Sequence, residues 1–268
     1  MNAPELLPLV DIQSLPDTRQ LPIQAVGVKG VRYPIRLRSG GRTVDTVATW
    51  TMSVGLAASV KGTHMSRFIE LLEAHQDQPL DLEGLGQLTR EMLQRLGASS
   101  GRIGLRFPWF LRKAAPVSGV ESLLDVDVSW HGELTSLHAR PSLQMAVTVA
   151  ATSLCPCSKE ISAYGAHNQR SHITMDVSLS QAMDIEELAA IGEASASCAV
   201  YGLLKRVDEK HVTERAYDNP KFVEDLVRDV ALALAAEPRV RRHQVEVENF
   251  ESIHNHSAFA ITGGKRDD

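Results

Sequence analysis

The chain has 268 residues, 43% of them hydrophobic, so it can bury a substantial core as one large domain or two modest ones. With 28 basic and 33 acidic side chains its net charge is −5, which argues against a general nucleic-acid or membrane-surface binder but allows a local basic pocket for an anionic small molecule. No stretch approaches the roughly 20 apolar residues of a membrane helix, and residues 1–20 lack the basic and apolar regions of a signal peptide. Three cysteines, an odd number, argue against a disulfide scaffold. We therefore expect a reduced, cytoplasmic compartment, with neither nucleic acid nor membrane as partner.

The first half of the chain predicts an arm followed by strand, strand, helix, helix, strand, strand. Residues 1–28 are expected to be extended, because prolines interrupt every possible helix. A Ser-Gly-Gly hairpin signal separates the first two strands, and the second helix has an Asp cap and ends on Gly97. The expected elements are strands 30–39 and 42–59, helices 63–76 and 81–97, and strands 101–110 and 120–134.

The same order recurs in the second half, although the sequence itself does not repeat. A long helix is expected to hold Cys198 on its apolar side, and the next helix starts at Pro220. The expected elements are strands 142–154 and 172–180, helices 185–207 and 220–237, and strands 241–252 and 256–264. Hairpins that flank helix pairs predict an α+β fold with antiparallel sheets and helices on one face. Such sheets have open edges, which proteins often manage by oligomerisation into a closed barrel.

Residues 153–172, SLCPCSKEISAYGAHNQRSH, place two cysteines one residue apart and a histidine downstream. Thiolate, imidazole and carboxylate suit Zn²⁺ and related metals, so Cys155, His167 and the later Glu209 are candidate ligands with an open fourth position. Two alternatives remain: small residues in a turn, or a Cys–His nucleophile without metal. Cys157 lies too close to Cys155 for an unstrained disulfide.

Two further clusters carry candidate chemistry. In NFESIHNHSAFA, Glu251, His254 and His256 lie within six positions, and the two histidines share one strand face. They suit proton transfer, although a solvated turn is the alternative. In NPKFVEDL, Glu224 opens a helix, where an acid is favoured in any case. As a functional group, the Glu224 carboxylate could pair with two adjacent N–H donors of a guanine-like ring.

The segment VKGTHMSRF precedes and begins the first expected helix. Helix N-termini that carry Ser, Thr, Lys and Arg bind phosphate well. An ordinary helix cap with solvated basic residues explains the same pattern. The phosphate candidates are Lys61, Thr63, His64, Ser66 and Arg67.

Four segments together, KGTHMSRF, LCPCSKEISAYGAHNQRSH, DEKHVTERAYDNPKFVED and VENFESIHNHSAFA, resemble the type IB GTP cyclohydrolase I family over nearly the whole chain past the arm. The resemblance implies two tunnelling-fold modules of ββααββ order, at 29–136 and 137–268 after the 1–28 arm, in a homotetramer. It also implies conversion of GTP and water to 7,8-dihydroneopterin triphosphate and formate, the first step of tetrahydrofolate biosynthesis. The cofactor would be a divalent metal, Zn, Mn or Fe, in the second module.

The resemblance also assigns roles to individual residues. Glu224 is expected to anchor the guanine base, and the segment 61–67 to hold the triphosphate. Lys159 and Arg170 are further substrate-binding candidates. The expected metal ligands are Cys155, His167 and Glu209, and the expected catalytic residues are Cys155, Glu251, His254 and His256.

Two rival functions stay open on the sequence. A nitrile reductase of the same fold also holds a guanine-like base with a Glu, but it uses a Cys nucleophile with NADPH and no metal. A non-catalytic pterin- or purine-binding protein is the second rival, although neither His254 nor His256 is missing. Cys157 is interpreted as a turn residue beside the site, with a redox partnership to Cys155 as the sharper hypothesis.

Overall fold

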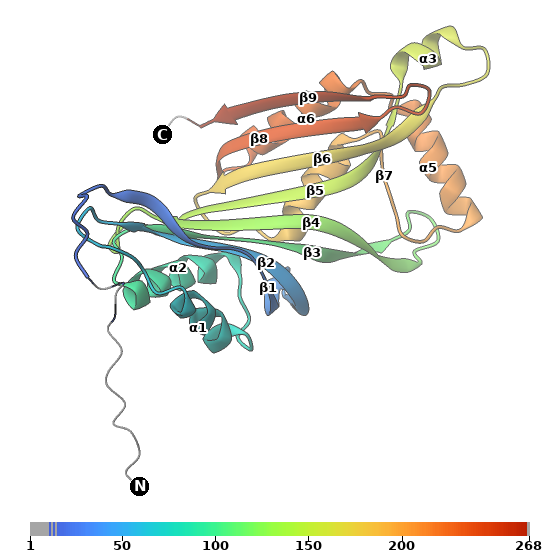
Figure 1. Ribbon diagram of the computed structural model, residues 1–268. Coiled ribbons are helices and arrows are strands. Elements are labelled where there is room, and N and C mark those ends of the chain that lie inside the picture. Colours follow the sequence, from blue (N-terminus) through green and yellow to red (C-terminus); the bar gives the residue numbers. More distant parts are fainter. Residues whose placement is uncertain (1–10, 12, 14, 267–268) are drawn as a thin grey trace.

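The computed structural model describes residues 11, 13 and 15–266, and its main feature is one antiparallel sheet with helices packed against it (Figure 1). Within that part of the chain the sheet has nine strands, eight of them in the order β1-β2-β3-β4-β5-β6-β8-β9, while the short β7 pairs with β5. The strands are β1 Ile23–Ser39, β2 Arg42–Leu56, β3 Gly101–Ala114, β4 Glu121–Leu134, β5 Ser142–Leu154, β6 Asn168–Leu179, β7 Cys198–Ala199, β8 Val240–Phe250 and β9 Ser257–Lys265.

Six helices occur between these strands in the described residues. The Asp81 side chain caps α2 by accepting from the Gly84 N–H at 2.8 Å, and Gly97 ends the helix in the left-handed conformation, as the sequence predicts. None of the described helices is long and apolar enough to cross a membrane. The helices are α1 Ser66–His75, α2 Leu82–Leu96, α3 Pro156–Ile161, α4 Ile185–Ser195, α5 Arg206–Asp218 and α6 Val223–Ala236.

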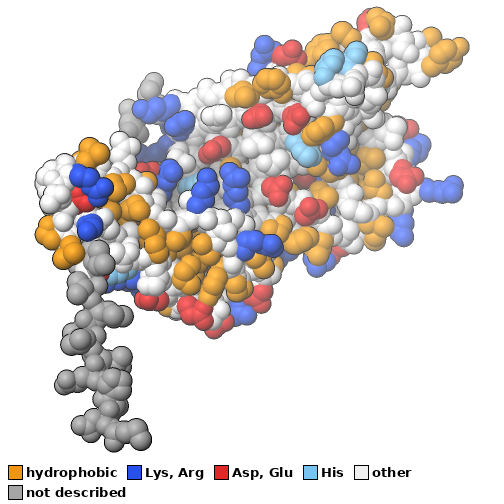
Figure 2. All heavy atoms as spheres, in the orientation of Figure 1, with side chains coloured by type: hydrophobic (Ala, Val, Ile, Leu, Met, Phe, Trp, Pro, Cys, Tyr) orange, Lys and Arg blue, Asp and Glu red, His pale blue; other side chains and the backbone are white. Residues whose placement is uncertain are grey.

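Alternation of buried and exposed residues gives each strand one face toward the core. The first hairpin turns on Gly40 and Gly41, both with positive φ, so Ser39 pairs with Arg42 across a two-residue turn. The inward side chains of the strands join the apolar faces of α1, α2, α4 and α6 in one cluster. The opposite face of β3 to β8 carries a polar hollow with both charge signs, and Figure 2 shows this mixed charge.

The sheet is continuous between the two halves of the chain, because β4 pairs with β5 from Asp127↔Thr148 to Glu133↔Ser142. The predicted order of two strands, two helices and two strands matches the first half, β1 to β4. In the second half three more elements appear, namely α3 inside the Cys-x-Cys loop, β7 and α5.

The long helix expected at 185–207 was wrong. The chain leaves α4 at Ser195, whose hydroxyl donates to the Ile191 carbonyl, and Cys198 then pairs with Thr152 in the β7–β5 ladder. Ser197 accepts from the Leu154 N–H at 3.2 Å. Serine side chains can form hydrogen bonds with backbone groups that would otherwise pair within a helix. Here the pairing of β7 with β5 outweighs the helix propensity of the segment. Cys198 is buried as expected, at 3% exposure, but in a strand.

The arm also ends earlier than expected, because β1 begins at Ile23 rather than at 29 or 30. Of the arm, residues 1–10, 12 and 14 lie outside the described part of the chain. Pro16 bridges to Val60, and the Asp17 N–H donates to the Ser59 carbonyl, so residues 16 and 17 lie against the chain just before α1.

Candidate active site

One end of the sheet gathers most of the residues that the sequence singles out. It is formed where β5 ends, β6 begins, and the β8–β9 hairpin turns, at the upper right of Figure 1. We call it the Cys155 end. The Cys155 N–H donates to the His167 carbonyl at 3.1 Å, so the loop between β5 and β6 closes on itself and brings these two residues together.

A serine inside this loop fixes its shape. The Ser158 hydroxyl donates to the Cys155 carbonyl at 3.1 Å and accepts from the His167 N–H at 3.2 Å. The Ser158 N–H in turn lies 3.4 Å from the Cys155 Sγ, which caps α3. Pro156 at the first position of α3 suits a helix start, because it has no N–H to leave unpaired. The backbone thus holds the direction of the Cys155 thiol.

The imidazole of His167 is oriented by a buried amide. His167 Nδ1 lies 3.0 Å from Oε1 of Gln169, and Gln169 is 7% exposed. Because an amide oxygen only accepts, Nδ1 carries the proton in this arrangement and Nε2 keeps its lone pair. This is the arrangement in which metal-binding histidines are commonly found. The donor chemistry of Cys155 and His167 therefore fits a Zn or Fe ion, whereas Mn prefers oxygen ligands such as a carboxylate.

The third expected ligand is not gathered with these two. No group of three or more His, Cys, Asp or Glu side chains is arranged to hold a metal ion within residues 11, 13 and 15–266. Glu209 lies exposed in the first turn of α5. The contact between α3 and α5 is made near the other end of α5, where Lys159 donates to the Tyr217 carbonyl and its Nζ lies 4.3 Å from the centroid of the Tyr217 ring. At 1.5 Å per residue, Glu209 and Tyr217 are about 12 Å apart along the helix axis.

The start of α5 is fixed by the residue next to Glu209. Asp208 is fully buried and accepts hydrogen bonds from Ser118 N–H at 2.8 Å, Ser118 Oγ at 2.6 Å, Val117 N–H at 2.9 Å and Lys205 N–H at 2.8 Å. Burial opposes the Asp208 charge, but the Ser118 hydroxyl and these N–H donors outweigh it and hold the pKa of Asp208 well below its usual range. The position of Glu209 is therefore tied to the β3–β4 turn.

Glu224 reaches the Cys155 end through the segment that precedes α6. The Lys221 N–H donates to the Leu154 carbonyl at 3.0 Å, and the Ser153 hydroxyl donates to the Lys221 carbonyl at 2.9 Å. Glu224 follows three residues later, exposed in the first turn of α6. A carboxylate there is stabilised by the helix N-terminus.

The β8–β9 hairpin supplies the histidine pair. The rings of His254 and His256 are stacked with centroids 5.1 Å apart and planes 12° from parallel, and both side chains are exposed. Glu251 is half-buried at the start of the same turn. On β6, His172 meets Phe250 edge-on, with centroids 4.8 Å apart. Figure 2 shows histidine side chains at this end, beside the projecting α3.

A buried polar network that sequence reasoning missed joins the strands of this end. Asn249 on β8 accepts from the Ser171 hydroxyl at 2.7 Å and donates to the Ser153 hydroxyl at 3.4 Å. All three side chains are at most 3% exposed. A separate hydrogen bond of 3.0 Å runs from the Asn219 side-chain amide to the Ala196 carbonyl. Polar residues at inward positions of apolar strands were the signal in the sequence that could have revealed it.

The phosphate candidates lie elsewhere, at the start of α1. Thr63 is buried, and its carbonyl accepts from the Gln13 amide at 2.9 Å. His64 Nε2 lies 3.2 Å from an oxygen of Asp11. Lys61 and Ser66 are exposed, next to these residues.

Arg67 is already engaged, since it donates to the Arg95 carbonyl at the end of α2 at 3.0 Å. The segment 61–67 follows β2, and the Cys155 end lies between β5 and β9, with β3 and β4 in between. The nearest strand of the Cys155 end is β5, three strand spacings or about 14 Å from β2 at about 4.8 Å each, and the pairing places the end of β2 beside the start of β5, opposite to Leu154. One chain therefore does not bring the phosphate candidates to the Cys155 end.

Two remaining predicted residues lie at or near the Cys155 end. Arg170 is exposed on β6, opposite Thr152 of β5. Cys157 is an exposed free thiol in α3. Cys155 and Cys198, the other two cysteines of the chain, are free thiols as well.

The arrangement of strands and helices is also found in uricases. A hyper-thermostable uricase variant superposes with a TM-score of 0.54 at 9% identity, covering 91% of this chain and 92% of its own. The uricase of Arthrobacter globiformis superposes with a TM-score of 0.51 at 10% identity, covering 91% and 94%. At such identities the likeness concerns the fold alone, and the class that the fold defines is α+β.

Sequence relationships then give the family. The profile of the family described as type I GTP cyclohydrolase folE2 matches residues 9–260. GTP cyclohydrolase FolE2 1 of Dechloromonas aromatica is 60% identical over 261 residues, 97% of this chain and 97% of its own length. Proteins named GTP cyclohydrolase FolE2 from Janthinobacterium sp. and Cupriavidus necator are 56% and 57% identical, over 96% and 94% of this chain and 95% and 93% of their own lengths. The chain belongs to the type I GTP cyclohydrolase FolE2 family.

Proposed function

We propose that the chain hydrolyses and rearranges GTP to 7,8-dihydroneopterin triphosphate and formate, the first step of tetrahydrofolate biosynthesis. Family membership supports the reaction, since relatives with this name cover nearly the whole chain at 53–60% identity. The observation that carries the proposal is the convergence of three segments at the Cys155 end: the Cys155–His167 loop, the start of α6 with Glu224, and the hairpin with the stacked histidines. A cytoplasmic location is part of this proposal, and the free thiols support it.

Glu224 is proposed to select guanine. Its carboxylate can accept two charge-assisted hydrogen bonds, from N1–H and from the exocyclic amine of the base. Adenine lacks this donor pair and would leave the carboxylate unpaired at the site, which costs several kcal/mol in a buried complex, on the order of 2–4. We expect Glu224→Ala to abolish GTP binding while metal content is retained. Unchanged GTP affinity would refute the assignment.

Cys155, His167 and Glu209 are proposed to hold a divalent Zn, Mn or Fe ion, which when bound supplies an activated water nucleophile at neutral pH. Gln169 keeps the Nε2 lone pair of His167 available for it. For this, Glu209 has to come close to Cys155 and His167. The hydrogen bond from Lys159 to the Tyr217 carbonyl already joins α3 to the C-terminal part of α5.

The hairpin residues are proposed to move protons. Addition of water to C8 of guanine leaves charge on N7, and a neighbouring imidazole can protonate that atom as the bond forms. The later ribose opening, rearrangement and ring closure are also proton transfers. His254 and His256 present two imidazoles 5.1 Å apart for these steps, with Glu251 at the start of the same turn. The triphosphate is proposed to contact Lys61, Thr63, His64, Ser66 and Arg67, with Lys159 and Arg170 as further ligands.

We propose a homotetramer in which one chain's segment 61–67 completes the Cys155 end of another. The separation of these two regions supports this, since they lie at least three strand spacings apart and at opposite ends of the strands. The outer strands β1 and β9 are open edges in the single chain, available for pairing. Ile161 and Tyr164, 84% and 101% exposed, project from the Cys155 end as apolar contact candidates. Within each chain we propose two tunnelling-fold modules, 29–136 and 137–268, joined through the β4–β5 pairing.

The test is GTP turnover by chelated protein resupplied with Mn²⁺ or Zn²⁺, followed by the fluorescence of the neopterin product and by formate release. We expect metal-dependent product in the parent and none with Cys155→Ala. Cys157→Ser is the matched control, because Cys157 lies two residues away and is exposed. We expect it to retain turnover.

Product formation without metal would contradict the ligand assignment. GTP binding with no product under any metal would support the two rival functions instead. NADPH-dependent, metal-independent reduction would indicate the nitrile reductase, and binding alone would indicate a purine- or pterin-binding protein.

A further inference from the structure

The N-terminal arm lies along the segment that precedes α1, and this segment holds the proposed triphosphate ligands. The described arm residues concerned are 11, 13 and 15–17, and we call them the strap. The Asp17 N–H donates to the Ser59 carbonyl at 2.9 Å, and Pro16 forms an antiparallel bridge with Val60. Further along, the Gln13 side-chain amide donates to the carbonyl of Thr63 at 2.9 Å. The strap therefore runs antiparallel to residues 59–64.

The strap places a carboxylate at one of the phosphate candidates. Asp11 Oδ2 lies 3.2 Å from Nε2 of His64, and Asp11 Oδ1 accepts from the Gln13 N–H at 3.1 Å, which orients the carboxylate. The other acid of the strap, Asp17, is paired with Arg19 at 2.5 Å, so its charge is compensated locally. A carboxylate oxygen and a phosphate oxygen are both anionic acceptors for an imidazole N–H. Asp11 therefore occupies the position beside His64 that a phosphate oxygen would take.

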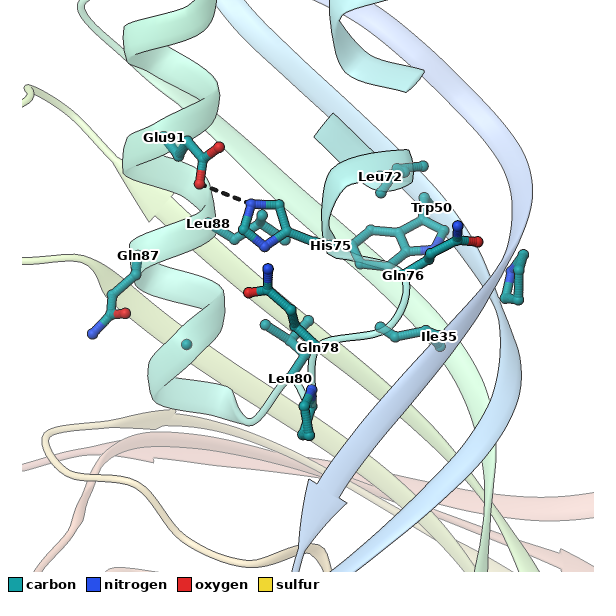
Figure 3. A pocket seen from close by; sticks show the side chains of 13 residues that line it. Ile35, Trp50, Leu72, His75, Gln76, Gln78, Leu80, Gln87, Leu88 and Glu91 are labelled. Atoms are coloured by element: carbon teal, nitrogen blue, oxygen red, sulfur yellow. Dashed lines mark hydrogen bonds and ion pairs between the residues drawn. The ribbon is translucent and has the colours of Figure 1, made fainter. Parts of the chain in front are cut away.

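Helix α1 is held at both ends, whereas the strap is not. At the start of α1, Arg67 donates to the Arg95 carbonyl of α2 at 3.0 Å. At its end, His75 Nε2 lies 2.8 Å from a carboxylate oxygen of Glu91, also on α2, as the dashed line in Figure 3 shows. The side chain of Asp11, by contrast, is 48% exposed. Exposed segments with few buried contacts open at low free energy, so the strap is the part that gives way to an approaching anion.

We propose that the strap is an autoinhibitory cover that competes with the triphosphate of GTP for the segment 61–67. The proposal rests on the proposed role of that segment in triphosphate binding. Two anionic groups at one imidazole repel each other, and a triphosphate brings several negative charges against the single charge of Asp11. Bound triphosphate therefore displaces Asp11 from His64, and the strap leaves the segment. The apparent GTP affinity is lowered by the fraction of molecules in which the strap is closed.

The first test locks the strap in place. A Cβ added at Gly62 lies 3.6 Å from the Gln13 Cβ, within the range of about 3.5–4.5 Å that disulfides require, so the full chain with Gln13→Cys and Gly62→Cys can be closed by oxidation and opened by reduction. We expect the oxidised form to bind GTP at least tenfold more weakly in calorimetry than the reduced form, and to have a correspondingly higher KM. The parent and Gln13→Cys alone, taken through the same oxidation and reduction, control for effects on the native cysteines.

The second test removes the charge of the strap. Asp11→Asn keeps the size of the side chain, and we expect it to lower the KM for GTP about two- to fivefold with kcat unchanged, the effect of one lost exposed ion pair. Asp77→Asn is the matched control, because Asp77 is an exposed acid just after α1 and away from the strap. This variant makes the same change of charge and should leave KM unchanged.

Equal GTP affinity in the oxidised and reduced double variant would overturn the proposal. If circular dichroism shows that the double variant is unfolded, Asp11→Asn decides alone, and a KM equal to that of Asp77→Asn would overturn it. Lys61→Ala separates this inference from the proposed function. Weaker GTP binding in Lys61→Ala without any effect of the lock would refute the strap and keep the triphosphate assignment. If neither change affected GTP affinity, both the strap and the assignment of the segment 61–67 would be wrong.

Discussion

The apolar region around α1 and α2 and the Cys155 end of the sheet differ in the interactions that hold them together. Around α1 and α2 the contacts are apolar, with Leu85 and Met92 fully buried against the strands. At the Cys155 end, buried hydrogen bonds among Ser153, Ser171 and Asn249 join β5, β6 and β8. Apolar packing is non-directional, whereas buried hydrogen bonds fix relative positions and are costly to leave unmade. The apolar cluster, which α4 and α6 share with α1 and α2, therefore supplies bulk stability, and the hydrogen bonds at the Cys155 end hold the relative positions of its strands.

Removal of core volume in the first half should have the largest effect on stability. Leu85 packs against the backbone of β4 at Gly132, so Leu85→Ala is expected to lower the free energy of unfolding by about 2–5 kcal/mol in urea denaturation. GTP turnover per folded molecule should stay close to that of the parent. Leu232→Ala, at a 69% exposed position on α6, is the control and should change stability by about 0.5 kcal/mol or less. A selective loss of turnover in folded Leu85→Ala would show that the apolar region around α2 also positions the candidate site.

Disruption of the buried network should affect both stability and activity. Asn249→Leu has a similar side-chain size but leaves the Ser171 and Ser153 hydroxyls without their partner, at an expected cost of about 2–3 kcal/mol in the free energy of unfolding. Turnover at a temperature where the protein stays folded should fall as well. Asn255→Leu, in the exposed hairpin, controls for stability. Retained turnover in folded Asn249→Leu would show that the network does not position the site.

Replacement of Gln169, whose amide orients His167, should weaken metal binding and leave the stability of the fold nearly unchanged. Gln169→Leu removes the acceptor at Nδ1, so we expect a loss of metal affinity of about 10- to 100-fold, measured by competition with a chromogenic chelator. Gln169→Glu keeps an acceptor and should restore most of the affinity. Equal affinity in Gln169→Leu and the parent would mean that His167 binds no metal through Nε2.

Replacement of Asp208, which anchors the start of α5, should change the stability of the fold in a pH-dependent way. The folded-state pKa of Asp208 lies below the ordinary value of about 3.9, so this group stabilises the fold above about pH 4, and the contribution is lost as the pH falls toward the folded-state pKa. Asp208→Asn should therefore lower the Tm at pH 7, and its difference from the parent should shrink in acid. Asp218→Asn, exposed at the end of the same helix, is the control. A difference that does not depend on pH would exclude the charge of Asp208 as the cause.

The sequence predicted the first half of the fold well because its signals are local. An Asp cap, a terminal Gly97 and a Gly-Gly turn each act within a few residues, and the expected order of elements there is the observed one. The proximity of Cys155 and His167 also follows from a short loop between paired strands. The failure at 185–207 has a long-range cause, since β7 pairs with β5 some 46 residues earlier, as in Thr152↔Cys198.

The sequence by itself therefore determined the α+β class, most strands, the helix caps and the family, because periodicity, capping and motif order are written along the chain. Only the tertiary structure decided which polar side chains meet. It placed Asn249 between Ser153 and Ser171 and tied the start of α5 to Ser118. These contacts join residues up to 96 positions apart, and no local propensity encodes such distances.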